Sequence, residues 1–143
     1  MFSKVLVANR GEIAVRIIQS LKRLGITSIA VYSYPDRHSQ HATLADEAYP
    51  LSGESAAETY LDTERILSIA RESGADAIIP GYGFLSENAD FAEACAEAGI
   101  HFAGPTPDQI REFGLKHRAR ALAEDAGVPL APGTGLLSGP EEA

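Results

Sequence analysis

The segment PGYGFLSENADF, residues 80–91, holds a tyrosine between two glycines where the sequence changes from strand-like to helix-like. Gly81 and Gly83 allow backbone conformations and close approaches that a side chain would block. Tyr82 can then present the apolar face of its ring and one hydroxyl group to a ligand. This pattern predicts either a ligand-binding loop or a tight connection between a strand and a helix, and the residues alone leave both open.

The segment REFGLKHRAR, residues 111–120, is the densest positive charge in an acidic chain. Lys116 stands near the start of a predicted helix, where the helix dipole disfavours a cation by up to about 1 kcal/mol. A lysine at such a position is a candidate ligand for an anion. The alternative is a solvated basic helix face.

Other chemistry has weaker support in the sequence. Only Gly11 follows the first predicted strand, where a dinucleotide fingerprint needs three spaced glycines, and Asp36, near the place of a ribose-binding acid, fits a capped turn equally well. His38 and His41 are spaced i, i+3 without a third ligand nearby in the sequence, so we predict no metal site. Cys95, the one cysteine, is predicted to be a small core residue.

The composition sets the class of protein. The chain has 143 residues, of which 45% are hydrophobic, and its formal net charge is -8, with 12 basic and 20 acidic residues. These values are typical of one globular domain and argue against a general nucleic-acid or anionic-membrane binder, which needs clustered positive charge. The sequence contains neither an apolar run near the length of a membrane span nor a secretory signal. We therefore expect a cytoplasmic protein.

Short β-branched runs alternate with longer segments of helical period, which is typical of a parallel sheet with crossover helices. We expect a Rossmann-like open parallel sheet of five strands in the order 3-2-1-4-5, with helices on both faces. The predicted strands are Lys4–Ala8, Ser28–Tyr32, Glu47–Leu51 (an edge strand, because of its proline), Ala77–Ile79 and His101–Ala103. Helices are expected at about residues 12–24, 61–73, 87–98 and 115–126, with a short capped helix in the segment GPTPDQIREFG, residues 104–114. The apolar face of the first helix is predicted to contain Ile13, Ile17, Ile18, Leu21 and Leu24.

Ligands of open parallel sheets bind beyond the carboxyl ends of the strands, where the winding direction reverses. In the expected strand order this position lies between the first and fourth strands. The segments NRGE (residues 9–12) and PGYGFLSEN (residues 80–88) should therefore lie side by side.

Several motifs occur in one order along the whole chain: KVLVANRGEIAVRII, the H-x-x-LADEAY segment at 41–49, TYLD at 59–62, AIIPGYGFLSENADFA and HFAGPTPDQIREFGLKHRAR. Together they resemble the N-terminal domain of biotin carboxylase, which precedes an ATP-grasp region. Members of this family join bicarbonate to biotin with MgATP through carboxyphosphate, and the carboxylated biotin delivers its carboxyl group to an acceptor. The resemblance implies biotin, ATP and Mg²⁺ as cofactors, and an ATP-grasp region and a biotin carrier domain as partners.

The resemblance also implies roles for individual residues. Lys116 matches the lysine that contacts the nucleotide phosphates, and Tyr82 and Gly83 match the loop that lines the bicarbonate and biotin pocket. Some family members use one surface of the first helix to form a homodimer. The matching residues are Arg16, Gln19 and Arg23, a stripe that alone would be an ordinary solvated face.

The chain departs from most members of the family at the nucleotide lysine. Where they read M-G-D-K, it reads Phe113-Gly114-Leu115-Lys116, followed by His117. FGLKHRAR, with PGTGLL downstream, is more similar to urea carboxylase, including urea amidolyase and guanidine-preferring relatives. The alternatives are the same domain from an acyl-CoA or pyruvate carboxylase and, in another class, a nicotinamide-binding oxidoreductase domain. The missing glycine fingerprint disfavours the oxidoreductase.

We expect residues 1–130 to form the domain and residues 131–143 to form a linker toward a missing ATP-grasp region. The resemblance places the glycine-rich lid, the Mg²⁺-binding glutamates and most nucleotide contacts of the family after Ala143. We therefore expect the chain alone to be inactive, to bind ATP weakly, and to expose apolar residues such as Leu122 on its last helix.

Overall fold

The computed structural model describes residues 1–133 and 139. Five parallel strands form one sheet in the order β3-β2-β1-β4-β5, as the sequence predicts. The strands are β1 (Lys4–Val7), β2 (Thr27–Ser33), β3 (Glu47–Leu51), β4 (Ala77–Ile79) and β5 (His101–Phe102). The α-helices are α1 (Gly11–Arg23), α2 (Gln40–Leu44), α3 (Thr63–Ser73), α4 (Ala89–Glu97), α5 (Pro107–Phe113) and α6 (Lys116–Asp125). A 3-10 turn, η1 (Tyr34–Asp36), follows β2.

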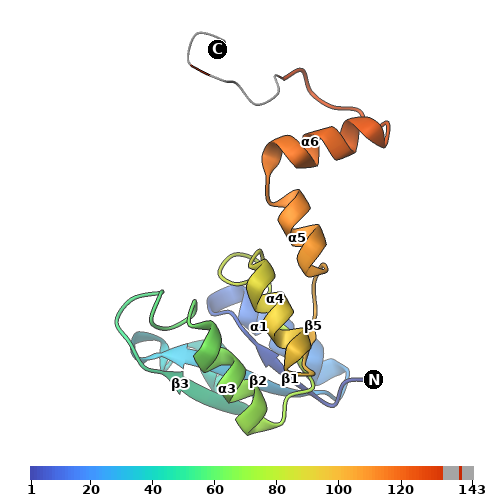
Figure 1. Cartoon of the computed structure of the whole chain (residues 1–143). Helices are drawn as coiled ribbons and strands as arrows, with labels where there is room; N and C mark the ends of the chain where they lie inside the picture. Colours follow the sequence, from blue (N-terminus) through green and yellow to red (C-terminus); the bar gives the residue numbers. More distant parts are fainter. Residues whose placement is uncertain (134–138, 140–143) are drawn as a thin grey trace.

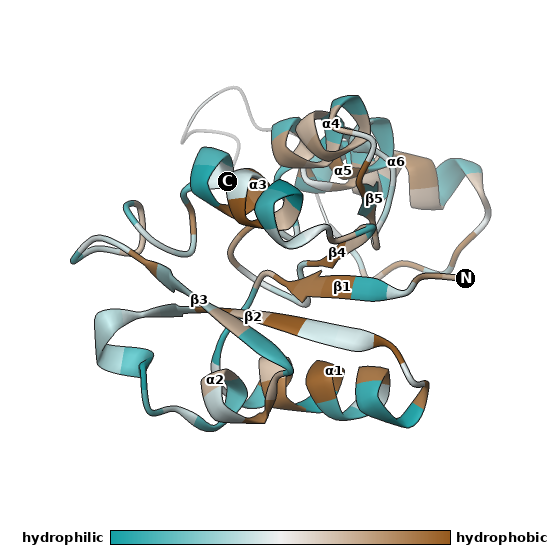
Figure 2. Cartoon of the chain, turned by 90° about the horizontal axis from the view of Figure 1, so that it is seen from below, coloured by the Kyte–Doolittle hydropathy of each residue, from teal (hydrophilic) through white to brown (hydrophobic). Residues whose placement is uncertain are grey.

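The two faces of the sheet are covered by different helices. Helices α1 and α2 lie on one face and α3 and α4 on the other (Figure 2). Along β1, Val5 and Val7 pack toward α1, whereas Leu6 and Ala8 belong to the larger core under α3 and α4. This alternation follows from the two-residue period of a strand, and both sides are apolar because both are covered.

Side-chain caps fix several of the helix starts. Asn88 accepts a hydrogen bond from the backbone N–H of Phe91 and begins α4. Asp62 begins α3 in the same way. Cys95 on α4 is completely buried, as predicted, and burial raises the pKa of its thiol to about 11, so it is an unreactive core residue.

Two predictions about the first half of the chain are incomplete or wrong. Leu24 does not belong to the buried face of α1, because it lies just beyond the last helical turn and is 70% exposed. Helix α2 was not predicted at all. Its five residues are too few to show a helical period, although His41 within it is completely buried.

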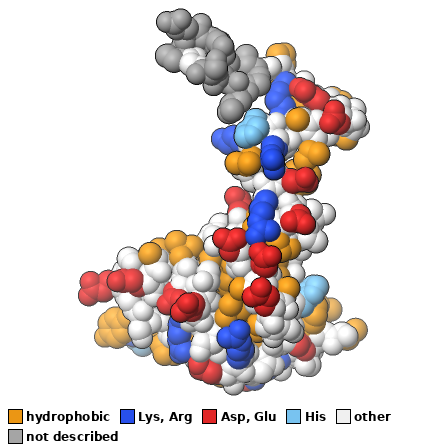
Figure 3. Space-filling model, in the orientation of Figure 1, with side chains coloured by type: hydrophobic (Ala, Val, Ile, Leu, Met, Phe, Trp, Pro, Cys, Tyr) orange, Lys and Arg blue, Asp and Glu red, His pale blue; other side chains and the backbone are white. Residues whose placement is uncertain are grey.

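Helices α5 and α6 form an arm that extends away from the body (Figure 1). Helix α5 begins with a capping box between Thr106 and Gln109 and packs on α4, whereas α6 packs on α5. Much of the apolar surface of the arm is exposed, as was expected for Leu122, and hydrophobic side chains are visible on it in Figure 3. The larger exposed apolar residues of the arm and the segment after it are Phe113, Leu115, Leu122, Val128 and Leu130. Most of the predicted linker at 131–143 lies outside the described residues.

Within the part of the chain that the structure describes, no helix is long and apolar enough to cross a membrane.

Candidate functional site

The turn after β1 and the loop after β4 lie side by side, as the strand order predicts. Asn9, only 2% exposed, joins them. Its Nδ2 donates hydrogen bonds to the carbonyl oxygens of Pro80 at 2.7 Å and Tyr82 at 2.8 Å, while its Oδ1 accepts one from the backbone N–H of Arg10. A buried amide that uses donor and acceptor groups in this way fixes the loop against the turn.

The two glycines of the loop are needed for different reasons. Both have left-handed backbones, with φ of 69° at Gly81 and 68° at Gly83. A Cβ atom at Gly81 would lie 3.0 Å from Nδ2 of Asn9 and 3.2 Å from Cγ1 of Ile13, whereas one at Gly83 would meet nothing within 4 Å. Close approach to the β1 turn therefore requires glycine only at position 81, and backbone conformation favours it at both.

Tyr82 faces outward from this loop and is 62% exposed. Its hydroxyl lies 3.5 Å from a carboxylate oxygen of Glu12, at the limit of a hydrogen bond. Beside the ring is a hollow of about 430 Å³, lined also by Ile13, Arg16 and Ile17 of α1. The loop thus presents a flat, exposed aromatic face with a hydroxyl and charged groups nearby.

A buried polar cluster behind the loop was not predicted as a unit. Asp36, 6% exposed, accepts two hydrogen bonds of 2.6 Å from the Arg10 guanidinium and one of 2.7 Å from the Tyr60 hydroxyl. Arg10 and these other donors hold the pKa of the Asp36 carboxyl well below its usual range, against the opposing effect of burial. Burial raises the pKa of Tyr60, which keeps its hydroxyl proton available for donation. Asp36 therefore has a structural role here, which agrees with the capped-turn interpretation.

His41 lies close to this cluster but takes no part in its hydrogen bonds. Among the described residues neither of its ring nitrogens has a hydrogen-bond partner, and burial lowers its pKa. Residues 1–133 and 139 contain no group of three or more histidine, cysteine or acidic residues that could hold a metal ion.

The basic segment of residues 111–120 is divided between two roles. Arg111 pairs with Asp90 at 3.1 Å and Glu93 at 2.6 Å and so joins α5 to α4, and Arg120 pairs with Glu124 at 3.2 Å. Within residues 1–133, Lys116 and Arg118 form no ion pair, and both are exposed. Lys116 lines a cavity of about 430 Å³ together with Ser86 and Glu87, which follow the Tyr82 loop. Its exposed side chain therefore lies next to the residues that follow that loop.

The predicted dimer stripe lies on the exposed side of α1. Arg16, Gln19 and Arg23 are all exposed. Arg16 approaches Glu12 one turn earlier at 3.6 Å, and Arg23 donates a hydrogen bond to the Ser20 hydroxyl at 3.2 Å. These local contacts leave the stripe open to solvent.

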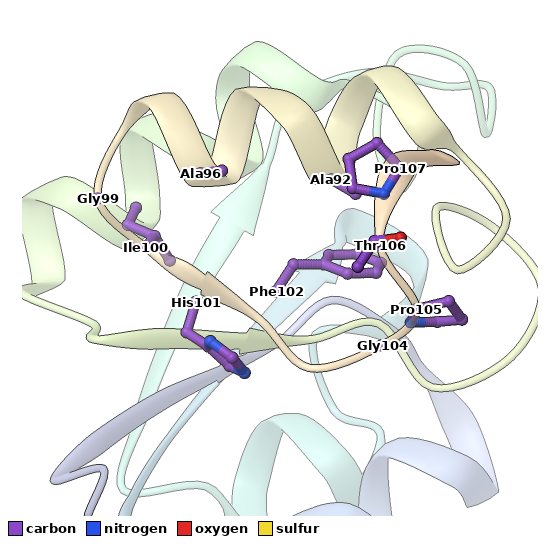
Figure 4. Close-up of a pocket in the computed structure, with 10 residues that line it drawn as sticks. All are labelled: Ala92, Ala96, Gly99, Ile100, His101, Phe102, Gly104, Pro105, Thr106 and Pro107. Carbon is purple, nitrogen blue, oxygen red and sulfur yellow. The ribbon is translucent and has the colours of Figure 1, made fainter. Parts of the chain in front are cut away.

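A hollow of about 390 Å³ lies at the β5 edge of the sheet, between α4 and the connection from β5 to α5. Figure 4 shows Ala92, Phe102 and Pro107 on its walls and His101 pointing away from α4. Its lining offers one hydroxyl, that of Thr106, and no acidic or basic side chain other than His101. This hollow is less suited to an anionic ligand than the cavity at Lys116.

The fold is an open α/β domain in which the loops after β1 and β4 adjoin where the strand order reverses, the position at which such sheets bind ligands. The sequence model of the family described as "Biotin carboxylase, N-terminal domain" matches residues 1–110 of the 143. The chain therefore belongs to the biotin carboxylase N-terminal domain family. This membership rules out the alternative hypothesis of a nicotinamide-binding oxidoreductase domain.

Individual relatives agree with this assignment. The chain is 62% identical over all of its 143 residues to urea amidolyase of Saccharomyces cerevisiae, of which it spans 8%. It is similar to the crystal structure of the K. lactis urea amidolyase, with a TM-score of 0.89 and 61% identity over 92% of this chain and 8% of that one. It is also similar to the biotin carboxylase domain of the Hydrogenobacter thermophilus 2-oxoglutarate carboxylase, solved as a dimer with MgADP, ADP and bicarbonate. There the TM-score is 0.92 and the identity 50% over 99% of this chain and 31% of that one.

Proposed function

We propose that the chain is the N-terminal domain of a biotin carboxylase within a urea-type carboxylase, which carboxylates biotin with bicarbonate and MgATP. The observation that carries the proposal is the loop of residues 80–83, which Asn9 holds against the β1 turn at the reversal of the sheet. The proposed boundaries are residues 1–130 for the domain and 131–143 for a linker toward an ATP-grasp region. A biotin carrier domain would be the second partner.

The residues described here fit one wall of such a site. The exposed Tyr82 ring offers a flat apolar surface to the bicyclic ring of biotin, and Gly83 leaves open space beside it. Lys116 offers its ammonium group to a nucleotide phosphate. Biotin, when bound, would supply the nitrogen that accepts the carboxyl group. This chain would bind and orient the reactants, and any Mg²⁺ would be held by residues outside it.

The similarity to urea amidolyases favours urea, or the related guanidine, as the final acceptor. The acyl-CoA and pyruvate carboxylases are the alternative, because chains of both kinds are also more than 50% identical to this one. Arg16, Gln19 and Arg23 are proposed to form a dimer surface. The chain alone is expected to be inactive and to bind MgATP weakly.

The proposal is tested by measuring bicarbonate-dependent ATP cleavage by the carboxylase that contains this chain. Urea, guanidine, acetyl-CoA and pyruvate are compared as acceptors. Lys116→Ala should lower kcat/KM for MgATP about tenfold to hundredfold, the range expected for the loss of a charged hydrogen bond. Arg71→Ala is the matched control, because it removes an exposed positive charge from the last turn of α3, which leads into the amino end of β4, away from the candidate site at the carboxyl ends of the strands.

Stimulation by urea or guanidine, lost in Lys116→Ala and kept in Arg71→Ala, would support both the acceptor and the role of the lysine. Stimulation only by a thioester or a keto acid would contradict the urea-type assignment while leaving the biotin carboxylase assignment in place.

A further inference from the structure

The Tyr82 loop has a second attachment, on the side away from Asn9. Phe84 is the only described residue other than glycine with a positive φ, at 43°. A bulky side chain disfavours this conformation, so it persists only where surrounding contacts impose it. The contact that an aromatic side chain can use here is with Tyr60, because the two ring centroids lie 5.3 Å apart with the planes tilted by 35°.

Tyr60 is itself held rigidly. Its side chain is only 4% exposed. Its hydroxyl donates a hydrogen bond of 2.7 Å to Oδ2 of Asp36 and accepts one of 3.0 Å from the backbone N–H of Ser33 at the end of β2. With both its donor and acceptor functions in use, the hydroxyl fixes the position of the ring beneath Phe84.

Asp36 completes the support. The Arg10 guanidinium donates to both of its carboxylate oxygens at 2.6 Å, and this bidentate geometry orients the carboxylate. Arg10 follows β1 and Asp36 follows β2, while Tyr60 precedes α3 and Phe84 follows β4. Four segments distant in the sequence therefore meet behind one loop.

A crevice of about 220 Å³ adjoins this cluster and is lined by Arg10, Asp36, Tyr60 and Phe84. The Phe84 side chain is also 36% exposed, so open space lies next to its ring and the contact with Tyr60 supports it on the other side.

We propose that Asp36, Tyr60 and Phe84 act as positioning residues that set where the loop presents Tyr82. This inference rests on the proposed function, in which Tyr82 forms a wall of the biotin and bicarbonate pocket. These three residues do not touch the reactants. They hold the end of the loop, while Asn9 holds its beginning and middle.

The test uses the carboxylase that contains this chain, with free biotin as the substrate and KM measured separately for biotin and for MgATP. Tyr60→Phe removes only the hydroxyl that fixes the ring, and Phe84→Leu removes the ring contact. Each should raise KM for biotin about threefold to tenfold, as expected for the loss of one hydrogen bond or aromatic contact, and leave KM for MgATP within about twofold. Phe84→Tyr keeps the aromatic ring and should restore KM for biotin to near that of the unsubstituted enzyme.

Tyr49→Phe is the matched control. It also removes a tyrosine hydroxyl that donates to a carboxylate, Glu47 at 3.0 Å, but it does so on the edge strand β3. Neither KM should change in this variant. Tyr82→Ala provides the reference for direct loss of the pocket wall.

Four outcomes would overturn the inference. A change confined to kcat, with both KM values unchanged, would reject the positioning role of Tyr60. A raised KM for biotin in Tyr82→Ala but not in Tyr60→Phe or Phe84→Leu would reject the positioning role and leave the proposed function standing. No effect in Tyr82→Ala would reject the pocket assignment and the inference with it. If Tyr60→Phe does not fold, the Phe84→Leu and Phe84→Tyr pair decides, and equal KM values for biotin in that pair would reject the ring contact.

Discussion

The Tyr82 loop and the α5–α6 arm each carry a residue proposed to bind a ligand, Tyr82 and Lys116, but the two regions are supported by different kinds of contact. The loop is held by buried polar side chains, Asn9 and the Asp36–Tyr60 pair, whose partners come from distant segments. Ion pairs of the exposed Arg111 join the base of the arm to α4. Within the arm, α6 packs mainly against α5. A buried network has a fixed geometry, whereas an exposed pair contributes little. The loop is therefore preformed within this chain, whereas the described contacts of the arm are local and mostly exposed.

The largest difference between the two regions is expected in the free energy of unfolding when one carboxylate is removed from each. Asp36→Ala removes the partner of both Arg10 and Tyr60 and should lower the free energy of unfolding by about 2 to 4 kcal/mol, less than for a fully buried pair because Arg10 is half exposed. Asp108→Ala removes an exposed partner of Arg111 in the arm and should change the free energy of unfolding by less than about 0.5 kcal/mol. Urea unfolding of the chain at pH 7 measures both.

The same pair predicts a pH dependence with a definite sign. The folded pKa of Asp36 is lowered, so its contribution is complete above the unfolded value of about 4 and is lost as the pH falls below that value. Unfolding midpoints measured between pH 6 and pH 3 should therefore fall less steeply in Asp36→Asn than in the unsubstituted chain. Equal slopes in the two proteins would contradict the ionised pair.

A smaller effect distinguishes the two glycines within the loop. Gly83→Ala should cost about 1 kcal/mol from its left-handed backbone alone, because open space surrounds the new methyl group. Gly81→Ala adds a clash with Asn9 and Ile13 and should cost about 1 kcal/mol more. Urea unfolding gives the two values. If the order were reversed, the close approach to the β1 turn would not be what requires glycine.

The smallest effect is expected in the arm, and there the substitution should stabilise. Leu115 is the N-cap of α6, has extended backbone angles, and supplies no side-chain hydrogen bond. Leu115→Asp would place a capping carboxylate at the positive end of the helix dipole and should stabilise the first turn by about 0.5 to 1 kcal/mol. Hydrogen exchange at the amides of His117 and Arg118 should slow severalfold. Leu115→Ala, which cannot cap, is the control and should not slow it.

Local patterns predicted most of the fold. The edge position of β3 and the burial of Cys95 follow from residues close together in the sequence, and the strand order follows from the fold class that the alternation of strands and helices indicates. Leu24 was wrongly placed on the buried face of α1 because the apolar period of the sequence continues past Arg23, where the helix ends. Helix α2 was missed because a helix of five residues in a polar segment has too little period to detect.

The candidate site was predicted in part. The sheet order brought NRGE and PGYGFLSEN together, and the structure confirms this through Asn9. The Arg10–Asp36–Tyr60 cluster was missed, although one signal existed, since Arg10 and Asp36 follow strands that were predicted to be neighbours. The division of the basic segment between Arg111 and Lys116 was also missed, because the two nearest acidic partners of Arg111 lie 18 and 21 residues earlier on α4.

The sequence by itself determined the alternation of strands and helices, the positions of glycine at left-handed turns and the motifs of the family. These features depend on periods, caps and backbone preferences that act within a few residues. Only the tertiary structure decided which charges are neutralised, which remain open to a ligand, and what supports Phe84. Those properties depend on distances between residues that are far apart along the chain, and such distances are set by packing on the sheet.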